Sequence, residues 1–313
     1  MDISVIIATY NRASILRGTL ESLAALQPQG ITHEIIVVDN NSSDNTKAVV
    51  EEFAQRAPIR YLFEERQGKN HALNAAVEVA QGELLVFTDD DVFVPADWLD
   101  RYWAAAQAHP EADVFGGSVV DRLPANAPLW IHVVLRPVDF GSGERPLVPG
   151  QYFLGANMAV RASVFRSGVR FDPGIGPTGE HTRLKGSETS IQVELEKRGC
   201  QRVSVGGEAV VHRVDAHPWM FSRACQFKRM YQVARGNTRL GLTWTGTWRI
   251  AGVPVARLYY ATKALLRCIA VRATFRSVDV CFSADMELAQ HLGVLHEAIL
   301  AYWRRGVGRN RER

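Results

Sequence analysis

Three consecutive carboxylates, Asp89, Asp90 and Asp91, form the part of this 313-residue sequence best suited to chemistry. They directly follow Leu84–Thr88, an apolar run typical of a buried strand. Neighbouring carboxylates repel one another unless cations or hydrogen-bond donors compensate their charge. Mg²⁺ or Mn²⁺ is commonly bound by one or two carboxylates and takes further ligands from phosphate oxygens. The triplet therefore predicts a divalent metal site for a phosphate-bearing substrate, and helix capping before Pro95 is the structural alternative.

Polar residues also follow two other strand-like runs. Thr9–Arg12 comes after Ile3–Ala8, and Asp39 comes after Glu34–Val38. Asp39 is placed to recognise a ribose or a base edge, and an Asx turn is the structural alternative.

Strand-like and helical patterns alternate over residues 1–120. The predicted strands are Ile3–Ala8, Glu34–Val38, Ile59–Phe63, Leu84–Thr88 and Val114–Val120, and the predicted helices are Ser14–Leu26, Asp44–Gln55, Asn70–Ala80 and Ala96–His109. Unbroken apolar strands separated by helices indicate a parallel sheet covered on both faces, in a Rossmann-like α/β fold. Ligands of such sheets bind at the carboxyl ends of the strands, where the polar residues above are expected to meet.

The alternation stops after residue 120. Residues 121–150 contain five prolines and are predicted to be a segment that covers the site. Regular structure is expected to resume at Tyr152–Val160, followed by a helix at Thr189–Arg198. Short strands are expected near Arg202–Val205 and Ala209–His212, and the chain beyond Pro218 reads as mostly helical.

Three segments, in this order, carry a family resemblance: Ser4–Arg12, Glu34–Thr46 and Thr88–Asp91. Together they resemble the nucleotide-sugar half of the family-2 inverting glycosyltransferases, which have the GT-A fold. Arg66–Ala76 is similar to that family's segment between the third and fourth strands. The resemblance implies transfer of a sugar from a nucleoside diphosphate sugar, a UDP-sugar by default, to a hydroxyl of a glycan or lipid-linked acceptor. It also implies inversion at the sugar and Mg²⁺ or Mn²⁺ as the cofactor.

The same resemblance implies roles for single residues on the donor side. The donor-binding residues would be Ala8, Thr9, Tyr10, Arg12, Asp39, Lys69, Asp89 and Asp90. Asp39 would accept a hydrogen bond from the base, and Lys69 would approach the nucleotide. Asp91 would bind the metal, although the third acid leaves open whether Asp90 takes that role.

Acceptor-side and catalytic residues are implied in the same way. Gly155, Ala156 and Asn157 resemble the family's Gly-x-Asn segment beside the sugar. The family usually has a Gly-Glu-Asp motif whose Asp is the general base. Here Ser187 replaces the Glu and Glu188 stands at the position of the Asp, so Glu188 is the expected base. A plain acidic residue at a helix N-terminus is the structural alternative for Glu188.

One histidine completes the expected site. His212 follows the last predicted short strand, at the position where the family places a metal-binding histidine. Taken without the resemblance, a single histidine is more often structural than a ligand.

Charge is distributed unevenly along the chain. The net charge is +3, but no acidic residue lies between Asp215 and Asp279. Within residues 250–271, the apolar residues fall on one side of a helical wheel, and Arg257, Lys263 and Arg267 lie largely opposite. Such a helix can lie in the interface of an anionic membrane, or it can pack on the catalytic core. No nucleic-acid partner is expected, because the sequence shows no RNA- or DNA-binding module.

The sequence therefore predicts a GT-A α/β fold with a C-terminal helical extension, in three parts. Residues 1–120 would bind the nucleotide sugar, residues 121–220 would bind the acceptor and carry the base, and residues 221–313 would form a basic helical extension.

Four cysteines without a CxxC pattern favour reduced thiols, and no secretory signal is apparent, so a cytoplasmic protein, peripheral on the membrane face, is expected. A nucleotidyltransferase and a non-catalytic sugar-nucleotide-binding protein are the alternative functions.

Overall fold

The computed structural model describes residues 1–135, 137–178, 181–243, 248–250, 253–274 and 276–309. The chain forms two compact units. The first comprises Met1–Pro124, Arg136–His181 and Ser187–Ala216, and the second comprises Ala125–Leu135, Thr182–Gly186 and His217–Arg313.

The first unit is built on a central sheet with the strand order β3-β2-β1-β4-β9-β6-β12-β8. The strands are β1 (Ile3–Thr9), β2 (His33–Asp39), β3 (Ile59–Phe63), β4 (Leu84–Thr88), β6 (Ala112–Gly116), β8 (Arg145–Pro146), β9 (Met158–Arg161) and β12 (Gln201–Ser204). β1 pairs in parallel with β2 and β4, and β2 pairs in parallel with β3. The α/β architecture predicted from the apolar runs is confirmed.

The parallel pairing expected for β1 to β4 is confirmed, but the complete sheet is mixed because strands from beyond residue 120 join it. β9 runs antiparallel to both of its neighbours, β4 and β6. Among the described residues between β6 and β9 no α-helix crosses back over the sheet, and a strand reached without such a crossover runs in the opposite direction.

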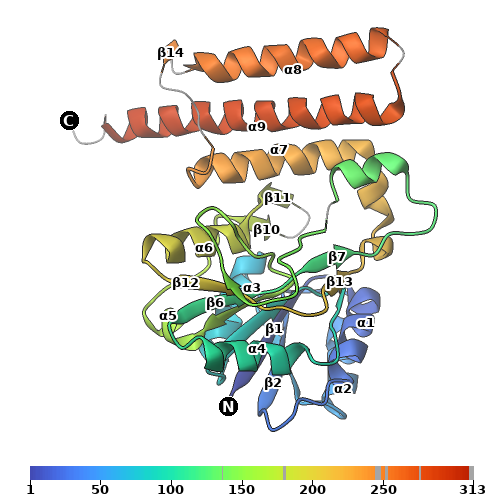
Figure 1. Cartoon of the computed structure of the whole chain (residues 1–313), viewed down its shortest axis with the longest axis vertical. Helices are drawn as coiled ribbons and strands as arrows, with labels where there is room; N and C mark the ends of the chain where they lie inside the picture. Colours follow the sequence, from blue (N-terminus) through green and yellow to red (C-terminus); the bar gives the residue numbers. More distant parts are fainter. Residues whose placement is uncertain (136, 179–180, 244–247, 251–252, 275, 310–313) are drawn as a thin grey trace. The chain divides into compact units, whose positions relative to one another are not determined.

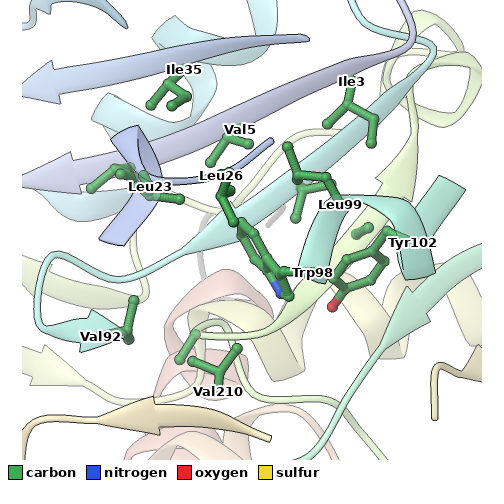
Figure 2. Close-up of a cluster of buried hydrophobic side chains, with 14 of the residues drawn as sticks. Ile3, Val5, Leu23, Leu26, Ile35, Val92, Trp98, Leu99, Tyr102 and Val210 are labelled. Atoms are coloured by element: carbon green, nitrogen blue, oxygen red, sulfur yellow. The ribbon is translucent and has the colours of Figure 1, made fainter. Parts of the chain in front are cut away.

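Helices cover both faces of this sheet. They are α1 (Ala13–Ala24), α2 (Thr46–Ala54), α3 (Lys69–Val79), α4 (Trp98–Ala108), α5 (Ala162–Arg166) and α6 (Ser187–Lys197). Alternate residues of β1 enter different cores, since Val5 and Ile7 belong to one buried cluster and Ile6 to the other. Figure 2 shows the first cluster, in which Trp98 and Tyr102 of α4 lie among the aliphatic side chains of the sheet and α1.

The predicted strand Val114–Val120 is in fact two strands. β6 ends at Gly116, and β7 (Val119–Asp121) joins a small second sheet with β5 (Val92–Phe93) and β13 (Val210–His212). The break follows from local hydrogen bonds, because the Gly117 N–H donates to the Asn157 carbonyl and the Asn157 side chain donates to the Ser118 carbonyl. Regular structure, expected to resume at Tyr152–Val160, begins only at Met158, the first residue of β9.

The second unit is mainly helical, as predicted for the chain beyond Pro218. Its elements are the 3₁₀ helices Leu129–Val133 and Pro218–Phe221, the helices α7 (Arg223–Arg239), α8 (Val255–Ala273) and α9 (Val278–Arg309), and the strands β14 (Arg249–Ile250) and β15 (Val253–Pro254). α9 lies between α7 and α8 (Figure 1). A buried carboxylate joins α7 to α9, because Glu297 pairs with Arg235 at 3.0 Å and also with Arg304 at 3.0 Å.

Three short elements complete the described chain. They are β10 (Gly176–Thr178), β11 (His181–Leu184) and the 3₁₀ helix Val214–Ala216. Part of the proline-rich segment 121–150 forms an edge strand, since β8 pairs with β12.

Candidate active site

The polar residues predicted at the strand ends do meet at one edge of the central sheet. Thr9, the last residue of β1, is in register with Asp39 at the end of β2. On the other side of β1, Ile7 is in register with Thr88, so Asp89–Asp91 emerge beside the end of β1. Parallel pairing brings these residues together because all three strands end on the same edge.

The buried carboxylate of Asp90 is held from two directions. The Thr9 hydroxyl donates to Asp90 Oδ2 at 2.7 Å, and Arg12 Nη1 donates to Asp90 Oδ1 at 2.8 Å. Burial raises the pKa of Asp90, while the Arg12 guanidinium acts in the opposite direction. Asp90 raises the pKa of Arg12 in return. Both oxygens of Asp90 thus already accept hydrogen bonds from protein donors.

Asp89 and Asp91 also face cationic side chains. Lys69, the first residue of α3, forms an ion pair with Asp89. Burial lowers the pKa of Lys69, but the carboxylates of Asp89 and Glu188 together raise it by more, so the pKa lies above its ordinary value. Asp91 lies 3.3 Å from Arg12 Nη1.

His212 lies on the other side of Asp91. Its Nε2 is 3.5 Å from Asp91 Oδ1, and its Nδ1 is 2.7 Å from Asp121 Oδ1. Burial alone lowers the pKa of the imidazole, but hydrogen bonds to Asp121 and Asp91 raise it to about 10. The pairing of β13 with β7, in which His212 is in register with Asp121, places the two side chains together.

These contacts change how the aspartate triplet is understood. From the sequence, the three adjacent carboxylates needed a cation or hydrogen-bond donors to compensate their charge, and Lys69, Arg12 and His212 supply such compensation within the protein itself. The clustering of acids alone is therefore no argument for a metal. Within the described part of the chain, no three His, Cys, Asp or Glu side chains are grouped so as to hold a metal ion unaided.

Asp91 and His212 nevertheless suit a metal that is completed by a substrate. A carboxylate oxygen and an imidazole nitrogen face each other, and both are ligand types that divalent cations accept once the cation displaces the proton on His212 Nε2. The carboxylate of Asp121 contacts the other ring nitrogen of His212, an arrangement common to metal-binding histidines. Two protein ligands are sufficient when phosphate oxygens provide others.

Asp39 is buried and hydrogen-bonded at the end of β2. Its Oδ1 accepts a hydrogen bond from the Ser42 backbone N–H at 2.9 Å, and its Oδ2 accepts one from the Tyr61 hydroxyl at 2.9 Å. The first contact reaches the third residue on, one position beyond the Asx turn given as the structural alternative. Since each carboxylate oxygen can accept more than one hydrogen bond, Asp39 retains capacity for a ligand. Sequence reasoning missed Tyr61, which lies within a strand and gave no signal.

Glu188 lies in the first turn of α6, beside the Gly155 segment. A Cβ atom placed on Gly155 would lie 3.5 Å from the Glu188 Cβ, an ordinary van der Waals distance, so the two segments lie next to each other. Lys69 interacts electrostatically with both Glu188 and Asp89, which links the expected base to the aspartate triplet.

Gln192, one turn after Glu188, fixes α6 to the same segment. Its buried side chain accepts a hydrogen bond from the Phe153 N–H at 2.8 Å and donates one to the Phe153 carbonyl at 2.9 Å. It also donates to the Glu188 carbonyl at 3.1 Å. Gln192 was missed from the sequence, where a glutamine within a helix reads as a solvated side chain.

Asn157 holds the backbone of the Gly155–Asn157 segment. Its buried Oδ1 accepts hydrogen bonds from Trp98 Nε1 at 2.9 Å and from the Tyr102 hydroxyl at 2.8 Å, and its Nδ2 donates to the Ser118 carbonyl. The Asn157 side chain, which was expected to contact an acceptor, therefore forms its hydrogen bonds within the protein. Ala156 is buried too, and its carbonyl accepts a hydrogen bond from the Thr88 hydroxyl.

Comparison with known proteins identifies the class. A model of glycosyl transferase family 2 matches residues 4–166, more than half of the chain, which therefore belongs to this family. Validoxylamine A glucosyltransferase of Streptomyces hygroscopicus subsp. jinggangensis is 33% identical over 132 residues, covering 42% of this chain and 31% of that protein. The GalNAc(5)-diNAcBac-PP-undecaprenol beta-1,3-glucosyltransferase of Campylobacter jejuni is 32% identical over 123 residues, covering 38% and 39%. The aligned regions thus span about a third of the length of these relatives.

A solved structure agrees with the predicted fold. The mannosyltransferase PcManGT from Pyrobaculum calidifontis, solved in complex with GDP-Man and Mn²⁺, superposes with a TM-score of 0.62 at 18% identity. The match covers 94% of this chain and 86% of that one. The GT-A fold with C-terminal helices is therefore confirmed, and membership of the family supports sugar transfer as the class of reaction.

Proposed function

We propose that this chain transfers a sugar from a nucleoside diphosphate sugar to a hydroxyl of a glycan or lipid-linked acceptor, with inversion at the anomeric carbon. The arrangement of charges carries the proposal. Three carboxylates and three cationic side chains converge at the carboxyl edge of the central sheet, and Glu188 shares Lys69 with this cluster.

The donor would bind along the ends of β1, β2 and β4. Ala8, Thr9, Tyr10 and Arg12 would line the base and diphosphate, Asp39 would accept a hydrogen bond from the base, and Lys69, Asp89 and Asp90 would complete this side. Arg12 and Lys69 bring positive charge to the place where a diphosphate would lie. A UDP-sugar is the default donor, and the solved mannosyltransferase, with its GDP-Man, makes a GDP-sugar the first alternative.

Mg²⁺ or Mn²⁺ is the proposed cofactor, held by Asp91 and His212 with Asp121 orienting the imidazole. Bound there, a divalent cation supplies Lewis-acid neutralisation of the charge on a departing diphosphate. The Mn²⁺ complex of PcManGT supports this choice for a protein of the same fold.

Glu188 is the proposed general base. Its carboxylate removes the proton of the acceptor hydroxyl, whose oxygen forms a bond to the anomeric carbon on the face opposite the diphosphate. The bond from that carbon to the phosphate oxygen breaks, and the nucleoside diphosphate leaves. Gln192 and the Gly155–Asn157 segment position the base and the acceptor side, and Asn157 contributes through the backbone that it anchors.

The Glu188→Gln variant tests this assignment. The amide cannot accept the proton, so transfer should fall about 10²–10⁴-fold, while donor affinity stays within about 2-fold because Gln is nearly isosteric. Transfer and donor affinity are measured against a panel of UDP- and GDP-sugars, with thermal shifts recorded with and without Mn²⁺. Glu194→Gln is the matched control, because Glu194 is an exposed residue of the same helix and pairs only with Arg198 among the ion pairs described. Loss of donor binding in Glu188→Gln, or equal loss of transfer in Glu194→Gln, would contradict the role of Glu188.

A non-catalytic sugar-nucleotide-binding protein remains the alternative, because Ser187 replaces the family's usual Glu. Donor hydrolysis with Mn²⁺ separates the two functions. An enzyme slowly releases the nucleoside diphosphate without acceptor and Glu188→Gln suppresses that release, whereas a binding protein shows a thermal shift and no release.

We further propose a cytoplasmic location, where nucleotide sugars and reduced thiols such as the four free cysteines are expected.

A further inference from the structure

Helix α8 in the second unit turns its large apolar side chains outward. Ala261, Ala264 and Cys268 are buried, and α8 packs against α9. The side chains on the other side are larger and solvent-exposed, and we call them the exposed α8 face: Leu258, Tyr259, Leu265, Leu266 and Ile269, with exposed fractions of 47–61%. At 3.6 residues per turn they fall within an arc of about 120°. A helix that packs only within its own fold would bury its leucines and expose its alanines.

The hairpin that leads into α8 adds to this apolar surface. Trp248, which precedes β14, is 84% exposed, and Ile250 of β14 is 72% exposed. The Val255 N–H at the start of α8 donates to the Trp248 carbonyl at 3.1 Å. Tryptophan and tyrosine are the aromatic residues enriched where apolar and polar phases meet.

Basic residues flank the exposed α8 face. α8 contains Arg257, Lys263, Arg267 and Arg272 and no acidic residue. Arg267 and Arg272 also pair with Glu287 and Asp285 of α9. Even with these acids counted, residues 221–313 contain sixteen Lys or Arg and five Asp or Glu, a net charge of +11. Two copies of so basic a surface would repel each other, whereas an anionic partner would be attracted.

We propose that the exposed α8 face, with Trp248 and Ile250, is a docking surface for an anionic lipid bilayer, in which α8 lies along the interface. No helix in the described part of the chain combines the length and apolar character needed to cross a membrane. The mode of binding is therefore insertion of one helix face among the head groups, with basic side chains reaching the lipid phosphates. This surface is independent of the proposed sugar transfer.

Vesicle co-sedimentation of the full chain tests the proposal. Vesicles of phosphatidylcholine containing about 30% phosphatidylglycerol should bind about 10-fold more protein than phosphatidylcholine alone, and about 0.5 M NaCl should weaken that binding. The triple variant Leu258→Ser, Leu265→Ser and Leu266→Ser should lose about 10-fold or more of the binding to anionic vesicles, because buried methylenes are lost from the interface.

A matched triple variant removes as much exposed apolar surface elsewhere. Phe63→Ser, Leu129→Ser and Val148→Ser alter side chains that are 51–77% exposed and lie outside the exposed α8 face. This variant should bind anionic vesicles like the wild type, and circular dichroism should show that both variants are folded. Equal and negligible pelleting with both vesicle types would overturn the proposal, as would equal loss in the two triples. Light scattering provides a further test. If the wild type is a dimer that does not bind vesicles, and the α8 triple variant alone is a monomer, the exposed α8 face is a self-association surface instead.

Discussion

At the scale of the residue, the candidate site depends on side chains that pair across long stretches of sequence. Arg12 meets Asp90, and Asp121 meets His212, over separations of 78 and 91 residues. Such pairs cannot be derived from spacing, because they depend on which strands become neighbours. The sequence supplied Asp90, Arg12 and His212 as candidates, but it did not show which side chains pair with one another.

The contact between Asp121 and His212 Nδ1 gives a testable consequence of the proposed metal site. In Asp121→Asn the carboxylate that orients His212 is lost, so the affinity for Mn²⁺ in the presence of UDP should fall about 10–100-fold. Electron paramagnetic resonance of free Mn²⁺ measures this affinity without recourse to activity. Asp215→Asn is the control, because Asp215 pairs with Arg122 at 2.6 Å in the same unit. An unchanged Mn²⁺ affinity in Asp121→Asn would remove Asp121 from the site.

At the scale of the element, the boundaries of the strands depend on packing as much as on apolar pattern. The Val114–Val120 run reads as one strand, yet Gly116 ends β6 and the chain passes into a different sheet at β7. The ring of Phe153 occupies the space beside Gly116, where a Cβ atom would lie 2.2 Å from the Phe153 Cγ. The Phe153 backbone in turn is hydrogen-bonded to the Gln192 side chain of α6. Gly116 therefore helps to position the helix that carries Glu188.

Gly116→Ala should therefore destabilise the first unit. The added methyl group has no space in a buried site and must displace an aromatic ring, at a cost of about 1–3 kcal/mol in the free energy of unfolding. Urea denaturation followed by fluorescence measures the change. Gly143→Ala is the matched control, since no heavy atom lies within 4 Å of the position of its Cβ and its φ is not in the left-handed region. Similar stabilities of the two variants would show that Phe153 moves aside freely.

At the scale of the whole molecule, the chain has four unbridged cysteines and an uneven distribution of charge. All four cysteines, Cys200, Cys225, Cys268 and Cys281, are free thiols. Burial raises the pKa of Cys200 to about 11, which makes its reactive thiolate scarce at neutral pH. The second unit gathers the excess of positive charge, while the carboxylates of the candidate site lie in the first.

Stability should accordingly be independent of reducing agents. Adding dithiothreitol should change the Tm by less than about 2 °C, because no disulfide contributes to the folded state. Differential scanning fluorimetry with and without the reductant measures this, and thiol titration of the unfolded chain should count all four cysteines. A clear fall in Tm on reduction would reveal a disulfide that the free thiols do not predict.

The sequence by itself determined the α/β class, the strands β1 to β4 and the edge at which Asp39 and Asp89–Asp91 gather, because buried parallel strands are continuous apolar runs whose ends must coincide. Only the tertiary structure decided how each carboxylate is compensated, since Lys69, Arg12 and His212 reach the triplet from different elements. It also decided the orientation of α8. Helical periodicity shows that two faces differ, but which face is buried depends on the neighbour, and α9 covers the small side chains and leaves the leucines exposed.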